Sequence, residues 1–273
     1  MSAEALEKIV SFTRRTTALT ADHVRQAAGA WIFSTPSIEV AWGLNHVRLT
    51  APTSFTDATS LADRAQAGLD YRRVTLEPGA LTPALEEAFT AAGWRAEHDL
   101  LMALSRPPDR VVDTGRVIET AEAEHLKLGR MWSAEEHPET SADVLAALTR
   151  FWHRESEVFG DCFLGVADPD GEGILAKAKL RSDGDVAQVE DVYTIPRARG
   201  RGHGRALVTR AVELARQAGH ELTFIIADDD DWPKRLYEQI GFAPVGRIVH
   251  FHRDVAVSPP APQMPVRTAM QSS

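Results

Sequence analysis

Cysteine is nearly absent from this chain of 273 residues, in which Cys162 is the single example. One cysteine excludes an internal disulfide and a cysteine-based metal cluster, and it favours a reducing, cytoplasmic setting. Long apolar runs are lacking too, and the first residues, Met-Ser-Ala-Glu-Ala-Leu-Glu-Lys, are charged. We therefore expect no metal, no membrane partner and no leader segment.

An excess of positive charge is also missing. The chain has 30 Lys and Arg against 39 Asp and Glu, a net charge of −9. This balance argues against a nucleic-acid partner and favours a cationic substrate such as an amine. The composition is 44% hydrophobic and 25% charged, which is typical of a globular protein, and the length suffices for two domains.

The most informative stretch, residues 189–218, reads as a strand, a glycine-rich turn and a helix. Val189, Val192, Tyr193 and Ile195 favour a strand, which Pro196 ends because it has no N–H group. From Arg205 onward, apolar residues recur at helical spacing. Between the two lie three glycines, Gly200, Gly202 and Gly204, which therefore stand at the N-terminus of the helix.

A helix N-terminus of this composition is suited to an anion. Its first N–H groups have no partner within the helix, and glycine lets a ligand approach the backbone. Four cations surround the turn: Arg197, Arg199, Arg201 and Arg205. The pattern predicts a phosphate or pyrophosphate ligand; the alternative is a tight turn that binds nothing.

The turn fits neither common nucleotide motif. It lacks the Lys-Ser/Thr ending of a P-loop, and Gly202-x-Gly204 is not followed by the third glycine of a dinucleotide fold. Arg199-x-x-Gly202-x-Gly204 instead resembles the acyl-CoA pyrophosphate loop of the GNAT superfamily of N-acetyltransferases. Leu236-Tyr237-x-x-x-Gly241-Phe242 resembles the second signature of that superfamily. The resemblance implies an α/β (α+β) fold, with a mixed, mostly antiparallel sheet flanked by helices.

The resemblance also implies a reaction, in which an acetyl group passes from acetyl-CoA directly to a primary amine of a small molecule or peptide. Tyr237 stands where the family has its general acid, although it is alternatively a packing residue. The base is Glu190, Asp191 or a water chain, and strand alternation predicts that only one of the two carboxylates faces the cleft. We prefer Glu190. The implied cofactor contacts are Val192, Tyr193, Arg199, Gly200, Arg201, Gly202, His203, Gly204 and Arg205.

The chain carries an internal repeat. A shift of about 148 positions places Gly93-Trp94 on Gly241-Phe242 and Phe89 on Tyr237, and it places residues 51–56 on the glycine turn, without glycine or arginine. We therefore predict a tandem GNAT arrangement: a degenerate GNAT-like domain at 1–106, a linker at 107–110, a catalytic domain at 111–256 and a disordered tail at 257–273. The alternative for the first domain is an unrelated packing domain.

Several local expectations follow from residue patterns. We expect one or two helices across 3–33, the second of them at 21–30, further helices near 57–67, 81–92, 119–132 and 141–159, and strands near 37–49, 72–76, 94–105, 162–166, 173–180 and 187–194. Asp230 stands where the family often has an asparagine, and Asp230 or Asp231 is suited to cap the next helix. Candidate acceptor contacts are Glu135, Glu136, His137, His153, Arg154 and Glu157; the alternative for each is a solvated side chain on a helix or loop. The acceptor itself carries no motif. We expect a monomer or homodimer, and the alternative function is a non-catalytic acyl-CoA sensor.

Overall fold

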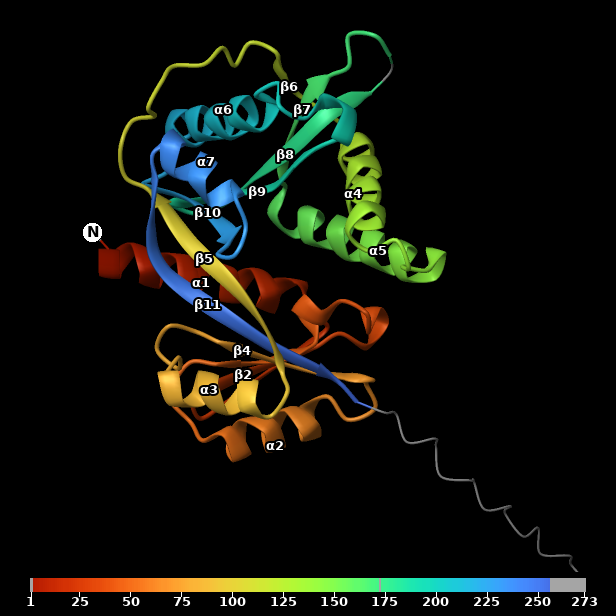
Figure 1. The fold of residues 1–273 in the computed structure, drawn as a ribbon, viewed down its shortest axis with the longest axis vertical. Coiled ribbons are helices and arrows are strands. Elements are labelled where there is room, and N and C mark those ends of the chain that lie inside the picture. The colour runs from red at the N-terminus through yellow and green to blue at the C-terminus, as the bar shows by residue number, and fades with distance from the viewer. Residues whose placement is uncertain (1, 172, 256–273) are drawn as a thin grey trace, which may run out of the picture.

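The computed structural model describes residues 2–171 and 173–255, and it has two halves of similar element order (Figure 1). The N-terminal half contains α1 (Ser2–Thr20), β1 (His23–Ala27), β2 (Ala30–Ser34), β3 (His46–Leu49), α2 (Phe55–Ala65), β4 (Tyr71–Leu76), α3 (Pro83–Ala91) and β5 (Arg95–Leu104). The C-terminal half contains β6 (Val117–Glu119), α4 (Glu122–Glu136), α5 (Ala142–Phe159), β7 (Cys162–Ala167), β8 (Ile174–Asp183), β9 (Val186–Thr194), α6 (His203–Gln217), β10 (Leu222–Asp228), α7 (Pro233–Ile240) and β11 (Phe242–Asp254).

A single mixed sheet of 11 strands runs through both halves, in the order β1-β2-β3-β4-β11-β5-β10-β9-β8-β7-β6. The pairs β3–β4 and β9–β10 are parallel, and the other pairs are antiparallel. The last strand of each half is exchanged, since β11 pairs with β4 and β5 pairs with β10. Figure 1 shows these two long strands running together from one half into the other.

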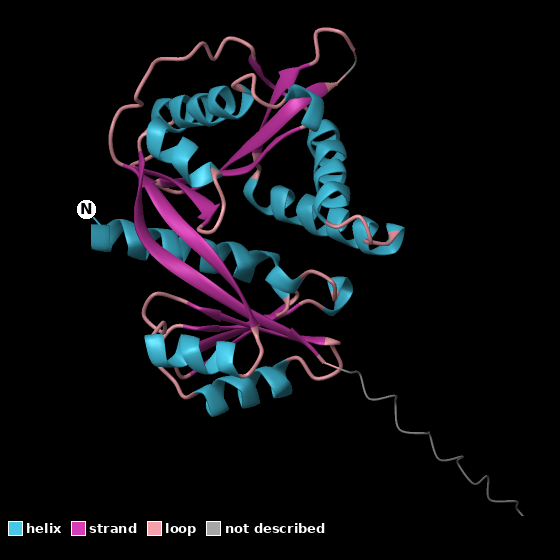
Figure 2. Cartoon of the chain, in the orientation of Figure 1, coloured by secondary structure: helices cyan, strands magenta, loops and turns pink. Residues whose placement is uncertain are grey.

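Helices cover both faces of this sheet (Figure 2). On one face, α6 and α7 pack on a core that includes Leu207 and Val189, while α2 and α3 pack on a second core around Phe89. The opposite face is covered by α1, α4 and α5. Ile9 and Phe12 of α1 pack there against Phe224 and neighbouring strands. Alternation along each strand thus divides its side chains between two helical layers.

The structure repeats the order β-β-β-α-β-α-β in the two halves. The shift of 148 positions places Phe55, the first residue of α2, on His203, the first residue of α6. It also places Phe89 in α3 on Tyr237 in α7. The predicted boundary at 106–111 stays a prediction, because β5 and β11 both cross to the other half.

Two expectations in the N-terminal half are wrong. Residues 21–30 form no helix; they belong to the β1–β2 hairpin, whose turn places Gly29 at φ +70°. Every residue of β1 is exposed, so the alanine-rich sequence carries no burial period that would reveal a strand. Of the strand expected at 37–49, only β3 forms, because 3₁₀ turns occupy 36–38 and 42–44.

The segment between the halves forms no helix or strand over residues 105–116, and it is anchored on α7. The Asp109 N–H donates to the Gln239 carbonyl at 2.8 Å, and the Arg106 N–H donates to the Gly241 carbonyl at 3.2 Å. The tail predicted at 257–273 lies outside the described residues. Within residues 2–171 and 173–255, no helix combines the length and apolarity that crossing a membrane requires.

Candidate active site

The N-terminus of α6 is open. Gly202 takes the N-cap position at φ +77° and no side chain caps the helix. The first N–H to bond within the helix is that of Ala206, which donates to the Gly202 carbonyl at 3.1 Å. The amides of residues 203–205 therefore precede the intrahelical ladder, and the helix dipole adds partial positive charge beside them.

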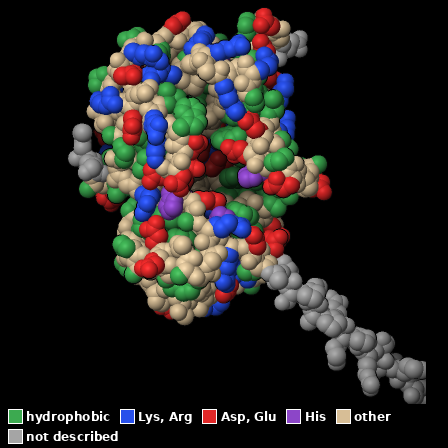
Figure 3. All heavy atoms as spheres, viewed as in Figure 1, with side chains coloured by type: hydrophobic (Ala, Val, Ile, Leu, Met, Phe, Trp, Pro, Cys, Tyr) green, Lys and Arg blue, Asp and Glu red, His purple; other side chains and the backbone are tan. Residues whose placement is uncertain are grey.

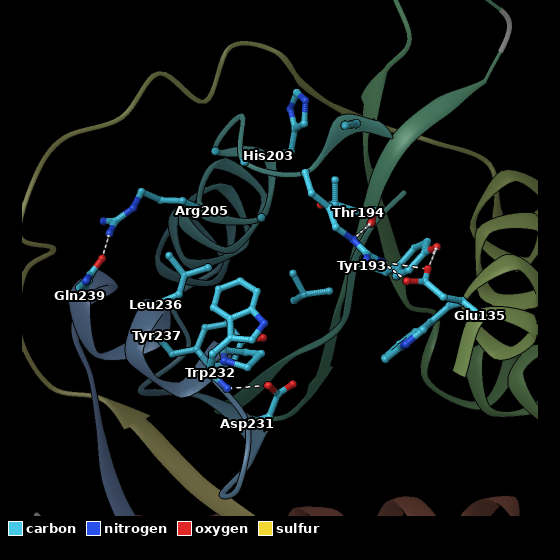
Figure 4. Close-up of a pocket in the computed structure, with 18 of the residues that line it drawn as sticks. Glu135, Tyr193, Thr194, His203, Arg205, Asp231, Trp232, Leu236, Tyr237 and Gln239 are labelled. Atoms are coloured by element: carbon cyan, nitrogen blue, oxygen red, sulfur yellow. Dashed lines mark hydrogen bonds and ion pairs between the residues drawn. The ribbon is translucent and has the colours of Figure 1, made fainter. Parts of the chain in front are cut away.

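These amides border a cavity of about 540 Å³ between α6, α7, α4 and the end of β9 (Figure 4). Most of the residues predicted to bind the cofactor line it: Val192, Tyr193, Arg199, Gly200, Gly202, His203, Gly204 and Arg205. Tyr237 lines it from α7. Arg201 is not among the residues of the described chain that line this cavity.

The cavity reaches the point where β9 and β10 separate. Their parallel pairing ends at Val189 and Ile225. Beyond it, β9 continues along β8, while β10 continues along β5. The two strands thus diverge and form a V. From residue 190 onward, the edge of β9 that was paired with β10 faces the opening of this V, while the other edge of β9 stays paired with β8.

A β-bulge lies at the apex of this V. The β8–β9 register shifts between Lys177 and Lys179, and Asp191 has φ +56°, the left-handed region that non-glycine residues rarely adopt. The bulge interrupts strand alternation, so Glu190 and Asp191 both lie beside Lys179 Nζ, at 3.2 and 3.4 Å. Neither carboxylate is among the described residues that line the large cavity, so the expectation that only one of them faces the cleft stays a prediction.

Glu190 is the more basic of the two carboxylates. Burial raises its pKa, and the nearby Lys179 and Arg181 offset that rise only in part. Within the described residues its Oε2 is buried and makes no hydrogen bond, but it is ion-paired with Lys179 at 3.2 Å and with Arg181 at 3.4 Å. A carboxylate with a raised pKa is better suited to accept a proton near neutral pH than an ordinary one.

Asp191 is held as an anion. Burial acts to raise its pKa, but Lys179, Lys177 and the hydrogen-bonded His125 outweigh burial and hold the pKa well below its usual range. Its Oδ2 lies 3.1 Å from His125 Nε2 and 3.6 Å from Lys177 Nζ. These partners tie the side chain of the left-handed residue to α4 and β8, so they also hold the bulge.

Tyr237 faces the cavity from the middle of α7, with 7% of its surface exposed. Burial raises its pKa to about 12, so the phenol is protonated at neutral pH. Figure 4 shows Tyr237 and Trp232 on one side of the cavity and Tyr193 and Glu135 on the other. A proton donor therefore stands across the cavity from the backbone of β9.

The arginines of the turn differ in their roles. Arg199 lies at the cavity and pairs with Glu135 at 2.7 Å. Arg205 is buried and turned toward Gln239 in Figure 4, and it also pairs with Asp109 at 2.6 Å. Arg197 pairs with Asp168 at 2.6 Å. Arg205 therefore supports the linker and α7, instead of offering a free charge to a phosphate.

The other candidate contacts are divided. Glu135 and Glu136 line the cavity. The remaining four lie elsewhere in surface pairs, among them His153 with Glu122 at 2.9 Å and Arg154 with Asp22 at 2.6 Å; the others are His137 and Glu157. Asp230 pairs with His98 at 3.3 Å. Neither Asp230 nor Asp231 caps α7, because Trp232 takes the N-cap position without a side-chain bond.

The sequence reasoning missed several residues of the site. Trp132 of α4 stacks on Tyr193 with ring centroids 5.7 Å apart, and Arg110 and Trp232 line the cavity mouth. It also missed the buried cations of β8, Lys177, Lys179 and Arg181, which alternate with Ala176 and Ala178. The signal available in the sequence was this alternation of lysine or arginine with apolar residues. It is also the pattern of a strand with one solvent-exposed face, so it did not identify the cations as buried.

Residues 125–242 match the model of the acetyltransferase (GNAT) family. A mycothiol acetyltransferase of Beutenbergia cavernae is 35% identical over 114 residues, which are 40% of this chain and 37% of that protein. The match thus spans little more than a third of that relative.

Two solved structures have a similar fold along most of the chain. A conserved protein of unknown function from Staphylococcus epidermidis has a TM-score of 0.66 at 12% identity, covering 86% of this chain and 95% of its own. A GCN5-related N-acetyltransferase from Kribbella flavida has a TM-score of 0.61 at 18% identity, covering 92% and 95%. The family match falls on the half that contains the glycine turn, the V and Tyr237, so residues 125–242 of this chain are similar to the GNAT acetyltransferases.

Proposed function

We propose that this protein transfers an acetyl group from acetyl-CoA to a primary amine of a small molecule or peptide by direct attack. The observation that carries the proposal is the open N-terminus of α6, which borders a cavity leading to the V between β9 and β10. Free amides and a helix dipole suit a pyrophosphate, and the cavity walls of Val192, Leu236 and Trp132 suit an apolar chain.

Two side chains and the backbone of the bulge carry the chemistry in this proposal. The amine nitrogen forms a bond to the thioester carbonyl carbon, and the carbon–sulfur bond breaks. Glu190 takes the proton that the amine loses, directly or through water, because burial raises its pKa. Tyr237 gives a proton to the leaving sulfur. Backbone N–H groups at the bulge, beside Val192, stabilise the negative charge on the carbonyl oxygen.

Asp191 is a positioning residue in this scheme. Its depressed pKa makes it a poor base, and its contacts with His125 and Lys177 hold the bulge. The exposed face of the molecule supports a cationic substrate, since Figure 3 shows acidic side chains gathered in and around the hollow between the two halves.

The experiment that tests the proposal is a calorimetric titration with acetyl-CoA and with CoA, followed by a thiol-release screen over a panel of amines. One site per chain and CoA release with an amine support the proposal. Binding without release on any amine favours a non-catalytic acyl-CoA sensor. Absence of binding would refute the assignment of the glycine turn.

A further inference from the structure

A second cavity, of about 240 Å³, lies between the two halves on the face of the sheet covered by α1 and α5. Its floor combines both halves: Thr75 comes from β4, Arg181 from β8 and Glu190 from β9. His250 joins them from the exchanged strand β11. Because Glu190 stands one residue beyond the last β9–β10 pair, this cavity and the larger one approach the apex of the V from different sides.

In the described chain, three buried polar atoms without a hydrogen bond border this cavity, and one of them, Glu190 Oε2, is ion-paired with Lys179 at 3.2 Å and with Arg181 at 3.4 Å. Among the described residues, Thr16 Oγ1, His46 Nδ1 and Glu190 Oε2 are buried without a hydrogen-bond partner. They come from α1, β3 and β9, so no single local distortion explains them. An unsatisfied buried polar atom costs about 1–3 kcal/mol, and such atoms are few in folded proteins. Their convergence on one cavity indicates a polar guest.

The arginines of the cavity wall are already neutralised. Arg48 Nε donates to Glu77 Oε1 at 2.7 Å, and Arg181 makes two bonds to the Asp161 carboxylate at 2.9 and 2.8 Å. Arg73 donates to Glu97 at 2.8 Å. A carboxylate on the guest would have to compete with these pairs, so the wall does not favour an anionic group.

The three atoms without a hydrogen bond are mostly acceptors. Burial holds the pKa of His46 well below its usual range, so the ring is neutral, and it hydrogen-bonds the Gly43 backbone. Its buried Nδ1 is then an acceptor, because a neutral imidazole has one donor nitrogen. Glu190 adds a second acceptor, and the Thr16 hydroxyl both donates and accepts.

A hydrogen-bonded chain adds further acceptors to the floor of the cavity. Asp99 Oδ2 lies 2.9 Å from His250 Nε2, and His250 Nδ1 lies 2.9 Å from Thr75 Oγ1. Burial and Arg73 lower the pKa of His250, which keeps the ring neutral. The carboxylate fixes the proton on Nε2, so the Thr75 hydroxyl donates to Nδ1. Lone pairs of Asp99 and Thr75 remain for a donor.

We propose that this cavity binds the acceptor as a small primary amine that carries hydroxyl groups and no carboxylate. The inference rests on the proposed acetyl transfer, and it names the substrate class. The amine lies by Glu190, and the hydroxyls bond to His46 and Thr16. At about 30 Å³ for each water, the cavity holds roughly eight water-sized groups, which suits an amino alcohol.

The experiment compares three amines of similar skeleton: serinol, serine and 3-aminopentane. Serine replaces one hydroxymethyl group of serinol by a carboxylate, and 3-aminopentane replaces both hydroxyls by methyl groups. Each is titrated calorimetrically into the full chain, with and without CoA. We expect serinol to bind at least about tenfold more tightly than either analogue. Equal binding of serinol and serine, or binding of none, would overturn the proposal.

A matched pair of variants tests the contact on α1. Thr16→Val removes the unpartnered hydroxyl, and Thr20→Val removes one that already bonds the Thr16 carbonyl at 2.9 Å and does not line the cavity. We expect Thr16→Val to weaken serinol binding about fivefold to tenfold, with acetyl-CoA affinity unchanged. Serinol affinity that is equal in the two variants counts against the proposal. Loss of acetyl-CoA binding in the wild-type protein counts against the acetyltransferase function instead, so the two failures are distinguishable.

Discussion

The helices α2 and α6 occupy corresponding places in the two halves, but their N-termini differ. At α2, the Ser54 hydroxyl accepts from the Asp57 N–H at 3.1 Å and donates to the Asp57 carboxylate at 2.6 Å. At α6, Gly202 offers no side chain. The first end is satisfied internally and carries a negative charge in its first turn, whereas the second is open to an anion.

The helices α3 and α7 differ in the same sense. Phe89 of α3 is fully buried and stacks on Phe251 with ring centroids 4.5 Å apart. Tyr237, its counterpart under the repeat, lines the large cavity. The N-terminal half therefore fills with aromatic side chains the region that the C-terminal half leaves hollow. One scaffold serves packing in one half and supports ligand binding in the other, and a few side chains make the difference.

The strongest test of this comparison is Gly202→Val. The residue has φ +77°, which strains any side chain, and the new side chain stands among the amides that the ligand needs. We expect acetyl-CoA affinity to fall at least about a thousandfold, or ~4 kcal/mol, by calorimetry. The control is Gly219→Val, at φ +84° with open space around its Cβ, beyond the other end of α6. If both variants lose binding equally, the loss reflects folding and not the turn.

Exchanging the aromatic residues sharpens the comparison. Tyr237→Phe should lower kcat by several hundredfold, within the usual range of about 10²–10⁴ for a general acid, with CoA affinity little changed. The reciprocal substitution Phe89→Tyr should bury a hydroxyl beside Phe55 and Trp94 and lower the free energy of unfolding by about 1–3 kcal/mol. We expect this variant to bind no acetyl-CoA in its N-terminal half. Full activity of Tyr237→Phe removes this residue from the mechanism.

Asp191→Asn tests the anchoring of the bulge. The substitution leaves Lys177 and Lys179 short of a buried partner, so we expect a loss of about 3 kcal/mol in the free energy of unfolding at pH 7. Because the folded-state pKa of Asp191 lies below its ordinary value of 3.8, its contribution is present above about pH 4 and disappears as the pH falls through the folded-state pKa. Denaturant unfolding should therefore show the wild-type and variant curves converging at acid pH. A constant difference between them would contradict the linkage.

Much of the C-terminal half could be predicted from the sequence, because its signals are local. Glycines before a helical period place the open N-terminus, and the Leu236-Tyr237 and Gly241-Phe242 pairs place α7 and the start of β11. The bulge could not be predicted in this way. It depends on Lys177 and Lys179 of β8 and on His125 of α4, which are distant in sequence, and it overrides the alternation that a regular strand imposes.

The joint sheet and the second cavity lay beyond sequence reasoning for a similar reason. The exchange of β5 and β11 depends on which edge each strand finds, and their residues favour a strand in either place. The cavity contacts Thr16, His46 and Glu190 belong to three separate elements that carry no common motif. The repeat predicted two similar halves, but not the surface that they build together.

Glu190→Gln distinguishes the two neighbouring carboxylates. A base acts when deprotonated, and burial raises the pKa of Glu190 above its ordinary value of 4.5, so wild-type kcat/KM should rise with pH through that pKa. Glutamine does not titrate, so the rising limb should flatten, and kcat should fall about 100-fold. The control is Asp191→Asn, which should keep the limb in the fraction that remains folded. A profile unaltered by Glu190→Gln moves the base to Asp191 or to water.

The smallest expected effect comes from Ser54→Ala, which opens the N-terminus of α2 by removing its cap. Thermal unfolding should show a loss of about 1 kcal/mol, the usual cost of a serine N-cap. Acetyl-CoA should still bind at one site per chain, because Asp57 keeps negative charge in the first turn of α2 and the region beyond it is filled by Phe89. If the variant gains a second binding site, the Ser54 cap alone prevents acetyl-CoA from binding in the N-terminal half. The aromatic side chains packed around Phe89 would then not be the cause of the missing site.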